Sequence, residues 1–195
     1  MEQKNWKDLK KDIHFSATIR GMDFVFSSTW GIFSPREIDE GSAMLLETLD
    51  VAPQANSLDL GCGYGAIGIP LAKLTPQGRV LMVDTNVVAV EYAKKNIIAN
   101  QLKNADAILS NGFSDVPDTS YDLIVSNIPA KVGNELLTIF LHDAKEHLAV
   151  GGTFTIVTIA GLREYMKRQL TEVFGNYKKV KQGKTYTVAS AERTS

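Results

Sequence analysis

The chain has 195 residues, of which 44% are hydrophobic and 22% are charged, and its formal net charge is −1. These values are ordinary for a globular domain, and the near-neutral charge excludes a global electrostatic attraction to nucleic acid or to a membrane surface. One cysteine excludes an internal disulfide and a cysteine-rich zinc site, and no apolar stretch is long enough to cross a bilayer, so we expect one cytoplasmic domain over residues 1–195 with no membrane partner.

Two predicted elements precede the main pattern of the chain. Residues 13–28 alternate between apolar and polar side chains on both sides of Gly21, which predicts a β-hairpin with Gly21 in its turn. The segment Ser34-Pro35-Arg36-Glu37 has the pattern of a capping box with proline at the first helical position. We therefore expect a helix from there to about Leu49, and an N-terminal extension over residues 1–56 that precedes a core at residues 57–195.

From Ser57 onward, predicted strands and helices alternate, which favours a mostly parallel sheet with helices on both faces. The last two strands are joined by Gln182-Gly183, a turn too short for a crossover, so one of them must run antiparallel. The expected fold class is α/β: a doubly wound, Rossmann-like, seven-stranded sheet with one antiparallel strand, plus the hairpin and its helix. The predicted strands are 58–60, 80–83, 107–109, 121–126, 153–159, 177–181 and 184–190, and the predicted helices are 66–74, 87–100, 135–147 and 162–174.

A glycine-rich turn follows the first strand of this pattern. Gly61, Gly63 and Gly65 let the chain turn sharply into a helix and let a ligand approach the backbone closely. Asp59, just before the turn, suits a positively charged ligand such as S-adenosylmethionine (SAM), which carries an ammonium and a sulfonium. However, residues 63–68 also satisfy the G-x-G-x-x-G dinucleotide pattern, and Asp84 follows at a suitable distance for either ligand. The turn alone therefore predicts a nucleotide-like ligand.

The end of the chain separates the two ligands. A parallel sheet finished by an antiparallel strand is typical of class I methyltransferases, whereas a nicotinamide enzyme would continue in parallel units and add a substrate domain. The prediction is therefore SAM rather than a dinucleotide.

A second group of candidate residues follows the strand at 121–126. Because ligands bind at the carboxyl ends of the strands where strand order reverses, Asn127 is expected to face the glycine turn across one crevice. The Asn127 side-chain oxygen and the Ile128 carbonyl are two acceptors that can grip the hydrogens of a planar amine, and Pro129 restricts the segment. The alternative is that Asn127 and Pro129 only form a turn after a buried strand.

These motifs together resemble the class I SAM-dependent methyltransferases, in particular the small group related to the ribosomal small-subunit RNA guanine-N2 methyltransferases. The resemblance covers about residues 13–190. It implies that Asn127, Ile128 and Pro129 hold the acceptor amine, which would be the N2 amine of a guanine in ribosomal RNA of the small subunit. The segments that carry the resemblance are Gly31-Ile32-Phe33-Ser34, Asp39-Glu40-Gly41-Ser42, Asp59 to Gly65, Asp84 with Asn86, and Asn127-Ile128-Pro129.

The resemblance also implies a cofactor site for SAM, and the spacing of the two histidines on the predicted helix 135–147 indicates no metal. Asp59 would reach the ammonium, Asp84 the ribose hydroxyls, and Asn111 with Gly112 the adenine, while Phe33 would cover the site. Cys62 is interpreted as a packing residue of the loop rather than as a nucleophile. The full set of residues expected at the cofactor is Phe33, Asp59, Gly61, Cys62, Gly63, Gly65, Asp84, Asn86, Asn111 and Gly112.

The sequence also departs from the family pattern near the acceptor. Ile128 stands where the family usually has proline, and Ala130 stands in the place of the ring that stacks on a base. Trp30, Phe33 and Phe113 are therefore the candidates for stacking on the acceptor. Two alternatives therefore stay open: a methyltransferase of a protein amide or small molecule, and a SAM-binding module with little catalysis. Lysines and arginines near residues 4–11 and 167–184 are consistent with RNA contact or with a solvated face.

Overall fold

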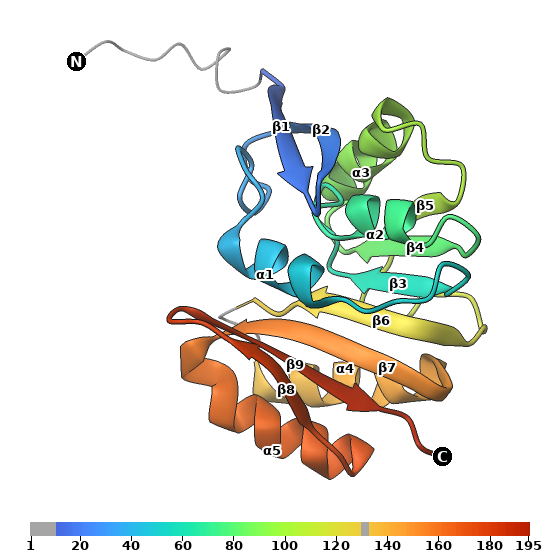
Figure 1. Cartoon of the computed structure of the whole chain (residues 1–195), viewed down its shortest axis with the longest axis vertical. Coiled ribbons are helices and arrows are strands. Elements are labelled where there is room, and N and C mark those ends of the chain that lie inside the picture. The colour runs from blue at the N-terminus through green and yellow to red at the C-terminus, as the bar shows by residue number, and fades with distance from the viewer. Residues whose placement is uncertain (1–10, 130–132) are drawn as a thin grey trace.

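The computed structural model describes residues 11–129 and 133–195, and it contains two β-sheets with the helices packed around them (Figure 1). Ala130 and the lysines at positions 4, 7 and 10 lie outside the described residues. The smaller sheet is the expected hairpin of β1 (Ile13–Ile19) and β2 (Met22–Ser28), and Gly21 lies in its turn with a φ of +76°. Within the described residues, no helix is long and apolar enough to cross a membrane.

The larger sheet has seven strands in the order β5-β4-β3-β6-β7-β9-β8. β9 pairs antiparallel with both of its neighbours, and the other neighbouring pairs are parallel, as expected from the sequence. Strand order reverses between β3 and β6, and sheets of this kind bind ligands in the crevice beyond the carboxyl ends of the two strands at such a reversal. The strands are β3 (Ser57–Leu60), β4 (Val80–Asp84), β5 (Ala105–Leu109), β6 (Tyr121–Asn127), β7 (Leu148–Ile159), β8 (Lys178–Gln182) and β9 (Tyr186–Glu192).

Helices cover both faces of this sheet, and each face has its own apolar core. The first core joins α1, α2 and α3 with the hairpin, and the second joins α4 and α5 with the opposite face of the strands. The near-continuous burial of β3 and β6 follows from this cover on both sides. The helices are α1 (Glu40–Thr48), α2 (Gly68–Leu74), α3 (Val87–Ala99), α4 (Asn134–His147), α5 (Arg163–Phe174) and the 3₁₀ helix η2 (Ala160–Leu162).

The predicted start of the first helix is wrong. α1 begins at Glu40, and its N-cap is Asp39, whose carboxylate accepts hydrogen bonds from the backbone N–H groups of Gly41 and Ser42. Ser34 does not cap a helix, because its φ is +43° and its hydroxyl donates to the carbonyl of Glu37 at 2.8 Å. The observed N-cap lies five residues after the predicted one, and from there α1 packs against β7 and β9.

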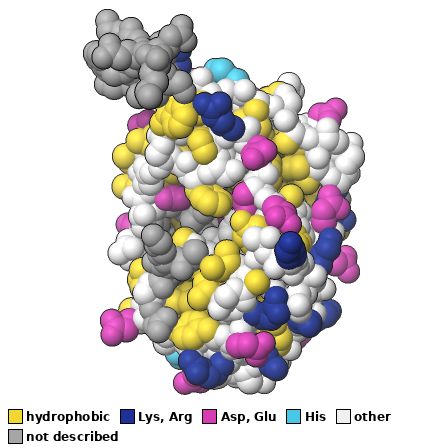
Figure 2. Space-filling view, turned by 90° about the vertical axis from the view of Figure 1, so that its left-hand side faces the viewer, with side chains coloured by type: hydrophobic (Ala, Val, Ile, Leu, Met, Phe, Trp, Pro, Cys, Tyr) yellow, Lys and Arg dark blue, Asp and Glu magenta, His cyan; other side chains and the backbone are white. Residues whose placement is uncertain are grey.

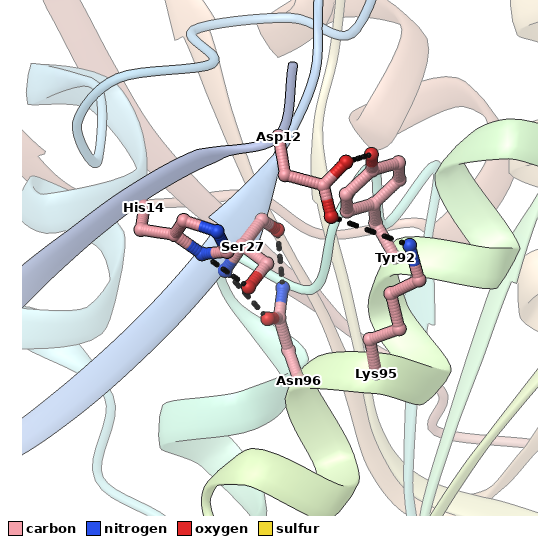
Figure 3. A network of polar contacts seen from close by, with 6 residues as sticks. All are labelled: Asp12, His14, Ser27, Tyr92, Lys95 and Asn96. Carbon is pink, nitrogen blue, oxygen red and sulfur yellow. Dashed lines mark hydrogen bonds and ion pairs between the residues drawn. The ribbon is translucent and has the colours of Figure 1, made fainter.

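The hairpin is attached to α3 by two asparagines one helical turn apart. The Asn96 amide accepts from the Ser27 N–H at 2.7 Å and donates to the Ser27 carbonyl at 2.9 Å (Figure 3). It also donates to the carbonyl of Tyr64 in the glycine loop at 2.8 Å. Asn100 makes the same pair of bonds to the backbone of Val25. The two asparagine side chains therefore join the hairpin to α3 by hydrogen bonds to its backbone groups.

Candidate active site

The glycine loop joins β3 to α2 and is fixed to the end of β4. The N–H groups of Gly61 and Cys62 donate to the carbonyl of Val83 at 2.9 and 3.0 Å, and the Gly63 N–H donates to the Asp84 carboxylate at 2.8 Å. Gly61 and Gly63 have φ values of +74° and +57°, a region that favours glycine. A methyl group on Gly61 would meet no protein atom within 4 Å, and one on Gly63 would meet only Ile32, at 3.8 Å. The loop therefore leaves open space beside its backbone.

Asp59 lies below this loop and is 1% exposed. One carboxylate oxygen accepts from the Gly68 N–H at 2.8 Å, and the other has no hydrogen-bond partner within the described residues. Burial raises the pKa of Asp59 to about 7, with the nearby Asp84 carboxylate adding to the effect. A buried carboxylate oxygen without a partner costs free energy, and a cationic or hydrogen-bond-donating ligand would satisfy it.

Cys62 has the environment of a packing residue. It is buried, and its Sγ lies 3.4 Å from the Gly63 carbonyl. Burial, together with the Asp59 and Asp84 carboxylates, raises the pKa of the thiol well above its usual value. The thiol therefore stays protonated at neutral pH, which does not suit a nucleophile.

Asp84 and Asn86 lie at the carboxyl end of β4. Asp84 uses one oxygen for Gly63 and the other for the Asn86 N–H, at 2.9 Å, so each oxygen keeps a further lone pair for a ligand hydroxyl. Asn86 is the N-cap of α3, and its side chain accepts from the Val88 N–H at 3.0 Å. The structure thus gives Asn86 a structural task that is independent of any ligand.

The segment after β5 brings only part of the expected adenine site together. Asn111 is exposed and follows Ser110, whose N–H donates to the Asp84 carbonyl at 3.0 Å, so it lies beside the end of β4. Gly112 is buried, and a Cβ there would lie 2.6 Å from the Phe140 ring. Phe113 is buried in the second core with its ring centroid 4.8 Å from that of His147. Phe113 is therefore not free to stack on an acceptor, because it fills the core under α4.

Asn127 ends β6 next to the glycine loop. The neighbouring Ser126 hydroxyl donates to the carbonyl of Leu60 at 2.8 Å, which joins the ends of β6 and β3 immediately before Gly61. The Asn127 amide nitrogen lies 3.2 Å from both carboxylate oxygens of Asp39 and 3.0 Å from the Ser42 hydroxyl. An ionised carboxylate only accepts hydrogen bonds, so the amide must turn its nitrogen toward Asp39, and its Oδ1 has no donor among residues 11–129 and 133–195.

Sequence reasoning did not assign a role to Asp39 or Ser42. The available signal was local, since an aspartate before an apolar-periodic segment is a good N-cap, but its contact with Asn127 spans 88 residues. Gly41 between them is required by the fold, because a Cβ there would lie 2.9 Å from the Tyr186 ring.

Ile128 and Pro129 continue from β6 toward α4. The Ile128 N–H donates to the Val157 carbonyl at 3.0 Å, and its side chain is buried in the second core. Pro129 is exposed. The Ile128 backbone is therefore held by the sheet, while its side chain serves the core.

The segment between β2 and α1 lies over this crevice. Ile32 is buried close to Gly63, Phe33 is exposed, and the Tyr64 hydroxyl donates to the Glu37 carbonyl at 3.0 Å. The carboxyl ends of β3, β4 and β6 point to the left in Figure 1, and Figure 2 looks onto that face, where hydrophobic side chains gather about its middle. Among the described residues, no group of three His, Cys, Asp or Glu side chains is placed to hold a metal ion.

The fold and this crevice define a Rossmann-like protein of the methyltransferase type. The model of the methyltransferase small domain family matches residues 23–190, and the chain belongs to that family.

Three relatives illustrate the similarity. The chain is 34% identical over 165 residues to ribosomal RNA small subunit methyltransferase C of Hamiltonella defensa, which covers 83% of this chain and 48% of that protein. It is 31% identical to the uncharacterized protein YbxB of Bacillus subtilis, over 92% of this chain and 90% of the relative. A solved structure of the T. thermophilus 16S rRNA N2 G1207 methyltransferase, in complex with AdoMet and guanosine, superposes with a TM-score of 0.84 at 32% identity, over 93% of this chain and 50% of the other. The chain thus spans about half the length of the methyltransferase C relatives.

Proposed function

We propose that the protein is a SAM-dependent N-methyltransferase that acts on the N2 amine of a guanine in ribosomal RNA of the small subunit. The observation that carries the proposal is the fixed amide of Asn127 at the end of β6, directly beside the glycine loop that ends β3. The names of the similar proteins support the same reaction, since one binds AdoMet and guanosine in its crystal structure.

The residues of the crevice fit SAM. The partnerless oxygen of Asp59 suits an ammonium, the remaining lone pairs of Asp84 suit ribose hydroxyls, and the backbone at Gly61 and Gly63 is open to close approach. Asn111, which lies beside Asp84 at the end of β5, is the proposed partner of the adenine. When bound, SAM would supply an electrophilic methyl group on a positively charged sulfur.

The work of the protein is then mainly orientation. Asn127 Oδ1 and the Ile128 carbonyl accept the two hydrogens of the acceptor amine, which turns the nitrogen lone pair toward the methyl group. The carbon–sulfur bond breaks as the carbon–nitrogen bond forms, and the nitrogen releases one proton to water. No strong general base is needed, because alignment for in-line attack lowers the barrier.

Two measurements test this proposal. Calorimetric titration with SAM and with its demethylated product tests the cofactor site, and incubation with labelled SAM and undermethylated small ribosomal subunits tests the acceptor. Binding together with label in the small-subunit RNA is the expected result. Absence of SAM binding would refute the assignment of the crevice.

A second candidate is methylation of a protein amide or a small molecule at the same crevice. The near-neutral charge of the chain favours it, as does Ala130, which stands in the place of the ring that stacks on a base in the family pattern. Label that enters purified protein or metabolites but not RNA would select this candidate. SAM binding with no transfer to any of these fractions would instead indicate a binding module.

A further inference from the structure

Two exposed aromatic side chains lie in the segment between β2 and α1, whose Ile32 side chain is close to Gly63. Trp30 is 45% exposed and Phe33 is 67% exposed, and they are the exposed aromatic residues of ranges 11–129 and 133–195. The other aromatic side chains of these ranges are buried or half-buried, Phe113 included. The two rings are three residues apart in the chain, and contiguous exposed apolar surface marks a binding site.

The segment that carries the two rings is firmly held. Gly31, with a φ of +89°, and the buried side chain of Ile32 lie between them, so that the chain turns both rings outward while Ile32 points toward Gly63. The Tyr64 hydroxyl donates a hydrogen bond to the Glu37 carbonyl. Asp39, two residues after Glu37, accepts a hydrogen bond from the Asn127 amide. The segment that carries the rings is therefore attached both to the glycine loop and to Asn127.

The Arg36 side chain, a planar cation, lies against the Trp30 ring. The Arg36 guanidinium carbon lies 5.0 Å from the centroid of the Trp30 ring, which is a cation–π arrangement. An exposed ring, a second ring and a stacked guanidinium are the parts from which proteins build platforms for unpaired nucleobases. Glu37 and Glu40 lie near Arg36 in the chain, so stacking rather than charge must supply most of the binding free energy.

We propose that Trp30, Phe33 and Arg36 form a stacking platform for unpaired nucleobases that flank the methylated nucleotide. The platform rests on the proposed function, because it assumes that the acceptor is RNA. Bases within a duplex are already stacked on each other, so the platform selects a single-stranded segment.

The experiment uses Trp30 itself as the reporter. The chain has two tryptophans, so Trp6→Phe leaves Trp30 as the sole source of tryptophan fluorescence. This parent variant is titrated, with the demethylated product of SAM present, with a labelled single strand of about ten nucleotides and with the matched RNA duplex. The single strand should quench Trp30 fluorescence and give the same Kd by anisotropy, and the duplex should do neither.

Substitutions then test each part of the platform. Phe33→Ala in the parent and Trp30→Ala in the natural chain should each weaken single-strand binding about tenfold, and Trp30→Ala should leave SAM affinity by calorimetry unchanged. Arg36→Lys keeps the charge but loses the planar stack, and should weaken binding several-fold. Val150→Ala is the matched control, because Val150 is also exposed but lies in the early part of β7, away from the carboxyl ends of the parallel strands.

The outcomes separate the platform from the proposed function. Unchanged Kd in the Trp30 and Phe33 variants, or equal binding of duplex and single strand, overturns the platform, and normal labelling of small-subunit RNA would then leave the function intact. If the parent binds no RNA and labels none while it still binds SAM, the RNA acceptor is wrong and the platform falls with it. Quenching of Trp30 by ribosomal protein instead of RNA would also overturn the proposal.

Discussion

The carboxylate of Asp39 lies 3.2 Å, through both of its oxygens, from the amide nitrogen of Asn127. The same carboxylate caps α1 through Gly41 and Ser42. One aspartate therefore fixes the start of a helix in the N-terminal extension and the orientation of the residue proposed to hold the acceptor. A helix of the extension is in this way part of the candidate active site.

Asp39→Asn should separate these two tasks. Asparagine caps helices about as well as aspartate, so the stability of the protein should change little. The asparagine amide can present either its oxygen or its nitrogen, however, so Asn127 would no longer be held in one orientation. We expect kcat for methyl transfer to fall about 10- to 100-fold while the Kd for SAM stays constant.

Two companion variants complete this test. Asn127→Ala should abolish transfer with SAM binding retained, and Glu40→Gln, at the exposed neighbour of Asp39, should behave as the natural chain. A wild-type kcat in Asp39→Asn would mean that the contact is only structural.

Gly63 and Gly65 should respond to alanine in different ways. At Gly63 the added methyl group meets the protein only at 3.8 Å, so we expect a loss of about 1–2 kcal/mol from the positive φ and a much larger loss of SAM affinity. At Gly65 the methyl group would lie 2.8 Å from Ile69, so the free energy of unfolding should decrease more than in Gly63→Ala. Urea unfolding and SAM calorimetry on both variants check the contrast, and full SAM affinity in Gly63→Ala would argue against ligand approach at that position.

Asp59 should make the stability of the ligand-free protein depend on pH. Its pKa is raised from 3.8 to about 7 by burial, so the folded state keeps the proton that the unfolded state releases. The contribution of Asp59 to stability is therefore fully present below pH 3.8 and is lost as pH rises to about 7. Asp59→Asn removes this group and should flatten the profile of Tm against pH in that window. If the profile of the variant matches that of the natural chain, folding does not raise the pKa of Asp59.

The affinity for SAM should also depend on the ionisation of Asp59, but it should increase with pH where the stability decreases. An ammonium binds the ionised carboxylate, so the Kd for SAM should decrease as pH rises toward about 7 and then level off. Asp59→Asn should lose this dependence, and calorimetry at several pH values measures it.

Asn96→Ala should detach the hairpin. The variant loses three hydrogen bonds, to both backbone groups of Ser27 and to the Tyr64 carbonyl, so we expect unfolding to become easier by about 3 kcal/mol. Asn100→Ala should cost less, because Asn100 lies nearer the surface. Ile98→Ala, at an exposed site on the same helix, is the control for urea unfolding and for proteolysis of the hairpin. Equal stability of the Asn96 and Ile98 variants would contradict the attachment.

Most of the fold could be predicted from local patterns. Alternation of apolar side chains marked β1 and β2 around Gly21, and the short turn at Gln182-Gly183 required the antiparallel β9. Local pattern failed at the start of α1, because Ser34-Pro35-Arg36-Glu37 has the pattern of a capping box but Asp39 caps the helix. It also failed at Phe113, since an aromatic residue after a strand has the same local signal in a core as in a binding site.

The sequence by itself determined that Asp59, the glycines and Asn127 lie at the carboxyl ends of neighbouring parallel strands, because strand direction is set by the alternation of strands with helices. Only the tertiary structure decided how Asn127 is oriented and which aromatic side chains remain exposed. Those properties depend on contacts such as that of Asp39 with Asn127 and on the burial of Phe113 against His147. The partners lie far apart in the chain, and no local pattern contains them.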